Sequence, residues 1–239
     1  MKNLDLQIFP IPITFGTLGN QTRELNKQLV SDMWKEYNNK PKLQGRSGSA
    51  VISAGSNGME NRYDSFKQLA TLLEEWVYPS IQKHGMSISS TKIVDMSAKI
   101  INDPVGFHMP HSHTCNYFWT GVYYPTTGIR NGEWLSQNED LDNMPVIEST
   151  TVPKPGNIVF LDPIENIKTT LLADGAYNSK PDGSSYVNRY PLHGLPISMT
   201  PRESACALFP AYLSHMTAPT RENNFERYTI PFHVEIKYY

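Results

Sequence analysis

The hydrophobic pattern of this chain changes period once, near residue 91, and that change restricts the possible folds more than any other feature. Upstream, apolar residues recur at helical spacing over residues 21–38 and again from Ser65. Ser65 and Gln68 match a capping box, which predicts where the second helix begins. Pro79 is expected to kink or end that helix, and Gly85 is a stop signal. The first 90 residues therefore predict two amphipathic helices.

Downstream of residue 91, apolar and polar residues alternate with period two, most clearly over residues 94–100, and this pattern is typical of strands. Later apolar segments predict further strands: 117–124, 157–161, 205–209 and 227–236. The segment Ile8–Ile13 predicts an edge strand, because its prolines cannot donate to a ladder. Helices followed by a run of strands favour a mainly β fold, in which helices cover one side of a sheet that closes on itself or on a second sheet.

Two long polar stretches, 130–154 and 163–203, separate the predicted strands. Loops of this length inside a domain are usually lids or binding loops, so we expect them to serve a site. The length of 239 residues suits one domain spanning residues 1–239. In that domain, residues 1–90 would support a β core formed by residues 91–239.

Composition excludes several classes of protein. The hydrophobic fraction of 39% and the charged fraction of 18% are typical of globular chains. A net charge of −2 without a long basic tract argues against binding to polymeric nucleic acid. Cys115 and Cys206 form no C-x-x-C pair, and no apolar run has the length of a membrane span or a signal peptide. We therefore expect a soluble cytoplasmic protein, and nothing in the sequence indicates its oligomeric state.

Three histidines form the strongest candidate for a functional site. His111 and His113 are two residues apart, so in an extended strand both imidazoles point to the same face. His215 could add a third nitrogen from a distant strand. Nitrogen donors suit Fe, Zn, Cu or Ni and argue against Ca or Mg. Arg227 follows and offers a planar fork for a carboxylate, as an oxygenase with an organic-acid co-substrate would need.

The other histidines have less specific interpretations. His84 ends a predicted helix and is expected to be an ordinary hydrogen-bonded side chain. His108 competes for the metal, but strand parity turns it away from His111 and favours a supporting or loop role. His233 shares parity with Arg227 and could line the same pocket.

Arg227 also has an alternative interpretation, as a solvent-facing strand residue paired with Glu226 or Glu222. Its strand argues for a site, because Arg227 and Thr229 share one face. The other face carries a nearly unbroken apolar series that should pack in the core: Tyr228, Ile230, Phe232, Val234 and Ile236.

Several segments, taken in order, resemble one known family. They are Ile8–Pro12, Pro110–His113, Gly121–Tyr124, Gly156–Pro163, Leu208–His215 and Glu226–His233. Together they resemble the bacterial and phage group of 2-oxoglutarate/Fe(II)-dependent dioxygenases, in which an H-x-H motif is followed by G-V-Y-Y and E-R-x-S/T-x-x-F strands. The resemblance implies a double-stranded β-helix (jelly-roll, cupin-like) core. Residues 130–154 and 163–203 match no part of that family's pattern.

The resemblance also implies a set of metal ligands. His111 would be the first Fe(II) ligand and His215 the distal one. His113 stands where most members of the wider superfamily carry Asp or Glu. Asp162 or Asp103 could supply a distant carboxylate instead. If His113 does not bind the metal, the open position would admit water or an anion. Halogenation would then be an alternative reaction.

Co-substrate binding follows from the same resemblance. Arg227 would clamp the distal carboxylate of 2-oxoglutarate with help from Thr229, and Tyr123 or Tyr124 would donate to the same carboxylate. The family reaction hydroxylates a C–H bond of a small molecule or a protein side chain and releases succinate and carbon dioxide. Ascorbate is a candidate reductant, and for a phage-encoded protein the compartment would be the host cytoplasm.

Two other functions compete with this one. A three-histidine metal enzyme that does not use 2-oxoglutarate would bind nickel or zinc through the same side chains. A non-catalytic β-helix domain, for example on a phage particle, would need no metal ligands. Arg227 with Thr229 favours the 2-oxoglutarate-dependent oxygenase over the three-histidine enzyme. The histidines argue against the non-catalytic domain.

Overall fold

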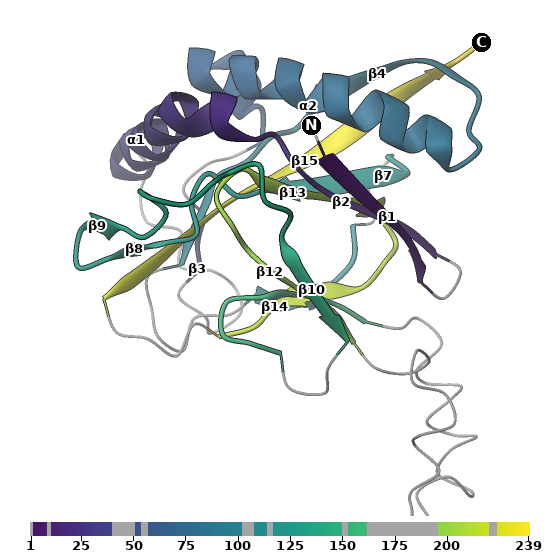
Figure 1. Cartoon of the computed structure of the whole chain (residues 1–239). Helices are drawn as coiled ribbons and strands as arrows, with labels where there is room; N and C mark the ends of the chain where they lie inside the picture. The colour runs from purple at the N-terminus through teal and green to yellow at the C-terminus, as the bar shows by residue number, and fades with distance from the viewer. Residues whose placement is uncertain are drawn as a thin grey trace, which may run out of the picture.

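Two helices cover one face of a large β-sheet in the computed structural model (Figure 1). They are α1 (Arg23–Asn39) and α2 (Asp64–Lys83), preceded by the short 3-10 helices η1 (Asn20–Thr22) and η2 (Met59–Asn61). The structure describes residues 2–8, 11–39, 51–53, 57–101, 108–113, 117–149, 153–161, 196–219 and 224–239. Within these ranges, neither helix combines the length and apolarity needed to cross a bilayer.

Both predicted helices are confirmed, and Gly85 follows the end of the second one as predicted, but Pro79 and Ser65 act differently from the prediction. Pro79 lies inside α2, which continues to Lys83, and Gly85 follows with φ of +81°. Ser65 does not cap the helix, because Tyr63 is the N-cap residue and makes no side-chain capping bond. The Ser65 hydroxyl instead donates to Asp32 Oδ2 of α1 at 2.7 Å, so the predicted capping box is wrong and the two helices gain a cross-link.

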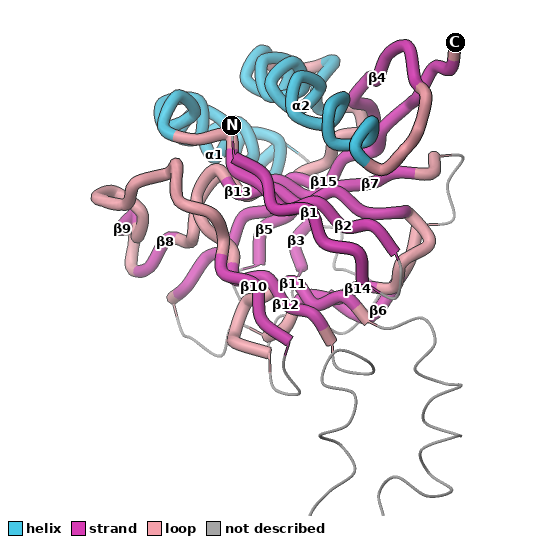
Figure 2. The backbone as a smooth tube through the Cα atoms, turned by 45° about the vertical axis from the view of Figure 1, so that its right-hand side comes forward, coloured by secondary structure: helices cyan, strands magenta, loops and turns pink. Residues whose placement is uncertain are grey.

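The described strands form two sheets that face each other (Figure 2). The larger sheet contains β1 (Lys2–Ile8), β2 (Ile11–Thr17), β3 (Val51–Ser53), β4 (Ile88–Val94), β5 (Lys99–Ile101), β7 (Trp119–Tyr123), β8 (Ile129–Arg130), β9 (Glu133–Trp134), β13 (Ala205–Pro210) and β15 (Phe225–Tyr238). The smaller sheet contains β6 (His108–His111), β10 (Val146–Ser149), β11 (Ile158–Phe160), β12 (Ile197–Thr200) and β14 (His215–Thr217).

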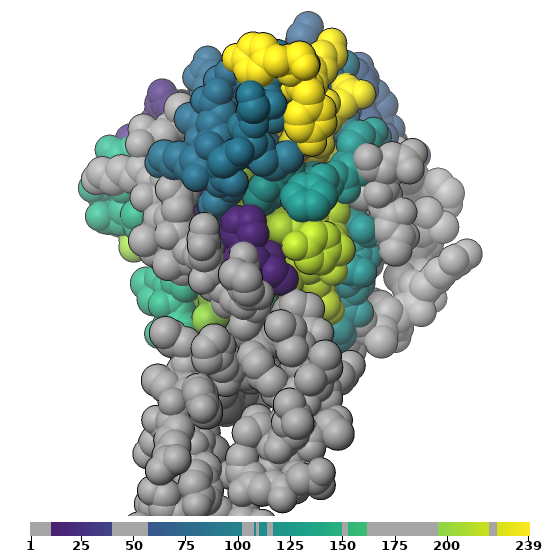
Figure 3. Space-filling model, turned by 90° about the vertical axis from the view of Figure 1, so that its right-hand side faces the viewer, coloured from purple at the N-terminus to yellow at the C-terminus, as the bar shows by residue number. Residues whose placement is uncertain are grey.

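Strand order brings distant parts of the chain together. The larger sheet runs β1-β2-β13-β7-β15-β5-β3, and the smaller one β10-β12-β11-β14-β6. All the strand pairs are antiparallel. On the surface, atoms from the first part of the described chain (purple) lie beside atoms of residues 196–219 (yellow-green), as the pairing of β2 with β13 requires (Figure 3).

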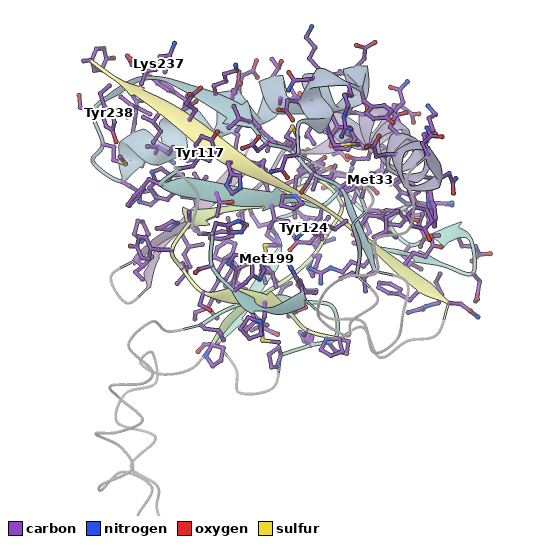
Figure 4. The ribbon with its side chains drawn as sticks, turned by 180° about the vertical axis from the view of Figure 1, so that it is seen from behind. Met33, Tyr117, Tyr124, Met199, Lys237 and Tyr238 are labelled. Carbon is purple, nitrogen blue, oxygen red and sulfur yellow. The ribbon has the colours of Figure 1, made fainter. Side chains whose placement is uncertain are left out.

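Each face of the larger sheet packs against a different apolar layer. One core lies between this sheet and the helices and includes Met33 of α1, and the other lies between the two sheets and includes Met199 of β12 (Figure 4). The long strand β15 separates them. Its predicted apolar series is confirmed on the helix side, where Tyr228, Ile230, Phe232 and Val234 are buried and Ile236 is partly buried. Arg227 and Thr229 alternate with that series and so face the smaller sheet.

The remaining strand predictions are confirmed in part. Ile8–Ile13 is not one edge strand: it spans the ends of two strands in a hairpin, with Ile8 opposite Ile11. The alternating segment that ends at residue 100 is divided into β4 and β5, and Asp95 between them has φ of +54°. The stretch 130–154 contains β9 and β10, and 163–203 contains β12, which pairs with β10. Residues 162–195 lie outside the described part of the chain.

Candidate metal centre

Two neighbouring strands of the smaller sheet bring His111 and His215 face to face. His111 ends β6, His215 begins β14, and the two residues are directly opposite in the register. Their ring centroids lie 4.3 Å apart. His113 follows β6 by two residues, and its ring lies 5.3 Å from that of His111 and 5.2 Å from that of His215. One nitrogen from each of the three rings lies within 4.8 Å of the others.

Backbone contacts fix two of these histidines. The His113 amide donates to the Ala211 carbonyl at 2.8 Å, which holds His113 near the turn that leads to His215. His215 Nδ1 lies 2.9 Å from the Leu213 carbonyl oxygen. Because a carbonyl oxygen only accepts, Nδ1 carries the hydrogen, and Nε2 is left with its lone pair for a metal. His215 is thus oriented as a ligand by its own backbone.

His108 contradicts the parity prediction. Its ring lies 4.0 Å from that of His111, closer than any of the three rings lie to one another. The cause is an irregular register: Thr217 pairs with His108 while His215 pairs with His111. Three steps along β6, from His108 to His111, are therefore opposite two steps along β14. Such a bulge returns His108 to the face of His111. Parity counting fails wherever a strand contains an extra residue.

Burial keeps the imidazoles of His108, His113 and His215 neutral. Desolvation, followed by neighbouring positive groups, lowers the pKa of His108 to about 2 and the pKa of His113 to about 3. Desolvation and His111 lower the pKa of His215 to about 3. A neutral imidazole has a lone pair to donate, whereas an imidazolium does not. His113 and His215 can therefore bind a metal at neutral pH without first releasing protons.

Arg227 lies buried close to these histidines. It is 2% exposed, and its pKa is lowered by burial. Its Nη2 donates to the Tyr124 hydroxyl at 3.2 Å, while Nε and Nη1 have no hydrogen-bond partner among the described residues. The predicted alternative pairing with Glu226 is absent, because the Tyr228 hydroxyl donates to Glu226 instead. Buried guanidinium N–H groups without acceptors are costly, so this geometry favours an anionic ligand.

Tyr123 and Tyr124 lie on opposite sides of the larger sheet. Tyr124 is buried between the sheets (Figure 4), and its hydroxyl accepts from Arg227. Tyr123 is buried on the helix side, where its hydroxyl donates to Asn26 Oδ1 at 2.6 Å. The prediction that named both tyrosines is therefore corrected for Tyr123. Alternation along the strand permits only one of two consecutive side chains to reach the site.

A small cavity of about 40 Å³ lies between the three histidines and Tyr124. It is lined by Lys99, His108, His111, His113, Gly121, Val122, Tyr124, Ile158, Phe209, His215, Thr217, Thr229 and Pro231. Thr229 thus lies where the sequence predicted it, whereas Arg227 lies behind Tyr124. His233 packs against the site from outside the cavity, with its ring 5.0 Å from that of His113 and stacked on Tyr117.

Sequence reasoning missed the lysine of the cavity lining and could not place other candidates. Lys99 was expected only as a polar residue of an alternating strand, but it lines the cavity opposite Thr229. Its register with Thr229 is the signal that would have found it, and register is not visible in the sequence. Asp103, Asp162 and Glu222 lie outside the described residues. His84 hydrogen-bonds to Thr14 at 2.8 Å, so its expected structural role is confirmed.

The donor set fits a transition metal. Nitrogen ligands about 2.1 Å from one ion are separated by at most about 4.2 Å, so a spread of up to 4.8 Å needs only a small closing movement. Three neutral nitrogens suit iron, zinc or nickel and do not suit calcium or magnesium. All three histidines line the cavity, where small ligands could reach the ion.

Comparisons with known proteins show which fold this is. No family model and no curated protein matches the chain. Among solved structures, the non-heme alpha ketoglutarate dependent epimerase SnoN from nogalamycin biosynthesis has a TM-score of 0.53 at 11% identity, covering 93% of this chain and 77% of its own. A Pseudomonas putida prolyl-4-hydroxylase has a TM-score of 0.53 at 8% identity, covering 95% and 92%.

A third structure, AviO1 from Streptomyces viridochromogenes Tue57, has a TM-score of 0.50 at 9% identity, covering 92% of this chain and 89% of its own. Identities this low show the shared fold alone. The mainly β fold with N-terminal helices and a double-stranded β-helix core, predicted from the resemblance, is therefore confirmed.

Proposed function

We propose that this protein is an Fe(II)- and 2-oxoglutarate-dependent oxygenase. The observation that carries the proposal is the pairing of two features between the same sheets. Three imidazoles converge within 4.8 Å, and a buried arginine bonded to Tyr124 of the same cavity has two nitrogens without partners among the described residues. A metal enzyme without a dicarboxylate co-substrate would not need that arginine. The names of two structural neighbours, an alpha ketoglutarate dependent epimerase and a prolyl-4-hydroxylase, agree with this class.

In this proposal His111, His113 and His215 hold Fe(II) on one face. His215 is oriented by its bond to the Leu213 carbonyl. His113 is positioned by its amide bond to Ala211. A histidine in place of a carboxylate leaves the full double charge of the ion uncompensated by the protein. The site should therefore attract anionic ligands more strongly than one with a carboxylate ligand.

Arg227, Tyr124 and Thr229 would bind 2-oxoglutarate. The two unpartnered Arg227 nitrogens can donate to the distal carboxylate, and the charge-assisted bonds would offset the cost of burying the guanidinium. The Tyr124 hydroxyl already accepts from Arg227, so its own hydrogen can point to the same carboxylate.

When bound, Fe(II) and 2-oxoglutarate supply an oxidant for an unactivated C–H bond, with release of succinate and carbon dioxide. The protein contributes position. Its imidazoles would keep the ion in place, and its guanidinium would fix one end of the co-substrate. We propose a small molecule or a protein side chain as the substrate and the cytoplasm as the compartment.

A second candidate is a three-histidine metal enzyme that does not use 2-oxoglutarate. It is favoured by one observation: no Asp or Glu is among the described residues that line the cavity. Zinc or nickel would fit the same three nitrogens. The Arg227 environment distinguishes the two candidates, because only the oxygenase uses its two unpartnered nitrogens.

The test is succinate production from 2-oxoglutarate by protein loaded with Fe(II), with ascorbate present, against a metabolite panel and a control without substrate. Wild-type protein and the Tyr123→Phe control, which alters the helix side of the sheet, should form succinate, and His215→Ala should not. Calorimetric binding of 2-oxoglutarate to the Zn(II)-loaded protein provides a second readout. The absence of both succinate and 2-oxoglutarate binding would refute the proposal.

A further inference from the structure

Lys99 has no role in the proposed reaction, although it lies inside the site. It begins β5 and is directly opposite Thr229 of β15, so both side chains leave the same face of the sheet. It lines the cavity together with His108, His111 and His215. Its charge is close enough to lower the pKa values of His108 and His215. An ammonium group therefore lies beside the three metal-binding nitrogens.

No partner balances this charge within the described residues. Lys99 is half-buried, and it has neither an ion pair nor a hydrogen bond with any other described side chain. Burial lowers the pKa of Lys99 to about 8, so the ammonium form is still the main one at neutral pH. Lysine is rarely buried unless it is paired with an anion.

The charge balance of the whole site points the same way. Arg227 and Lys99 contribute one positive charge each, a divalent metal would contribute two, and the three imidazoles would contribute none because an imidazole must be neutral to bind a metal. The described lining contains no Asp or Glu. Bound 2-oxoglutarate would bring two negative charges and leave two positive charges unbalanced in a poorly solvated cavity. Such a cavity should bind a further anion.

The two cations reach different spaces, although they lie close together on the sheet. Arg227 pairs with Ile101 and Thr229 pairs with Lys99, so Arg227 and Lys99 are diagonal neighbours on one face of the sheet. Diagonal neighbours are typically about 7–8 Å apart. Of the two, only Lys99 lines the cavity of the histidines, while Arg227 lies behind Tyr124. The anion at Lys99 would therefore lie beside the metal.

We propose that Lys99 binds an oxyanion next to the three histidines, distinct from the carboxylate held by Arg227, and that the substrate of this enzyme therefore carries a carboxylate or phosphate group. The proposal rests on the proposed function, because it assigns the substrate class of the same site. The 1-carboxylate of 2-oxoglutarate has the same chemistry as such a substrate group. The experiment therefore separates these two sources.

The test is calorimetry with full-length protein loaded with Zn(II), which is redox-inert and suits histidine ligands. Wild type, Lys99→Met, Lys99→Arg and the control Lys92→Met are compared. Lys92 is an exposed lysine of β4 in the same sheet. One arm titrates 2-oxoglutarate alone, and the other titrates inorganic phosphate or acetate into protein saturated with 2-oxoglutarate. Bound zinc and melting temperature are measured to show that each variant is folded and loaded.

We expect Lys99→Met to weaken anion binding at least tenfold, Lys99→Arg to restore most of it, and Lys92→Met to leave it unchanged. If Lys99→Met weakens phosphate or acetate binding to protein saturated with 2-oxoglutarate, the substrate is the source of the oxyanion. If it weakens only the binding of 2-oxoglutarate itself, the source is the 1-carboxylate, and the proposed substrate class is overturned. Unchanged binding in both arms overturns the role of Lys99. If wild type does not bind 2-oxoglutarate, the proposed function fails, and phosphate titrated without it still tests Lys99.

Discussion

At the scale of single residues, the site is defined by polar groups whose partners are incomplete. Arg227 is the clearest, because two of its nitrogens are buried without acceptors among the described residues. An uncompensated buried guanidinium costs more than its hydrogen bonds to Tyr124 return. Natural folds retain such a group mainly where a ligand completes it, so the role of Arg227 is testable apart from catalysis.

Replacing Arg227 with alanine should weaken 2-oxoglutarate binding and leave metal binding nearly intact. Loss of one member of a buried charge-assisted pair costs on the order of 2–5 kcal/mol, equivalent to about 30-fold or more in affinity. Titration of the Zn(II)-loaded variant with 2-oxoglutarate measures this loss. Arg202→Ala is the control, because Arg202 pairs with Glu139 on a different part of the protein. Unchanged affinity in Arg227→Ala would remove the clamp assignment.

His113 decides which kind of metal site this is. We predict that His113→Ala abolishes turnover and weakens Fe(II) binding, whereas His113→Asp keeps measurable metal binding because a carboxylate can replace an imidazole. If His113 only supported a ligand, His113→Ala would instead lose about 10–100-fold in metal affinity or activity. Competition with a chelating dye measures metal affinity, and His84→Gln, which alters a histidine bonded to Thr14, is the control. Full activity in His113→Ala would mean that another group, with Asp162 the first to examine, holds the ion.

At the scale of elements, β6 shows why part of the site was predictable and part was not. His111 and His113 were found because two histidines two residues apart are a local signal, and His215 was found because its segment resembles the family pattern. His108 was misplaced because the register shift beside His215 is set by strand pairing, which sequence spacing does not record. Lys99 was missed for a related reason, since its neighbour Thr229 lies on a distant strand.

β15 was predicted well because its two faces have opposite characters. Its apolar face is buried against the helices, and its Arg227 face lies toward the smaller sheet. Tyr123 and Tyr124 could not be assigned in the same way, because both residue types suit either core. The failed capping box has a tertiary cause, since Asp32 of α1 takes the Ser65 hydroxyl.

β7 provides a prediction at this scale, because Gly121 has neighbouring strands on both sides. A Cβ at Gly121 would collide with the ring of Phe232 and lie 2.6 Å from the Ala207 carbonyl oxygen. Since a backbone oxygen cannot move aside alone, Gly121→Ala should destabilise the sheet by about 1–3 kcal/mol, as overpacking typically does. Denaturant unfolding measures the change. Ser90→Ala, at an exposed position of β4, is the control, and equal stability of both variants would contradict the close packing described.

At the scale of the whole molecule, two apolar cores are separated by one sheet, and the site lies in the core between the sheets. The helix-side core could be predicted from periodicity, because each helix presents one apolar stripe. The core between the sheets could not, because its strands are short and join only through pairings across the chain. Burying several histidines within this second core has a consequence for stability that involves the entire fold.

Without metal, the protein should lose stability as the pH falls from 7 to 5. Burial lowers the pKa values of His108, His113 and His215 to about 2, 3 and 3, whereas unfolded histidines titrate near 6.5. Below about 6.5 the unfolded chain takes up protons that the folded chain excludes, so each histidine costs about 1–2 kcal/mol between pH 7 and pH 5. Melting temperatures of chelator-treated protein across this range measure the effect. His108→Gln should flatten the decline, because it removes one titrating group from the unfolded state; identical slopes in variant and wild type would show that His108 is not held neutral by the fold.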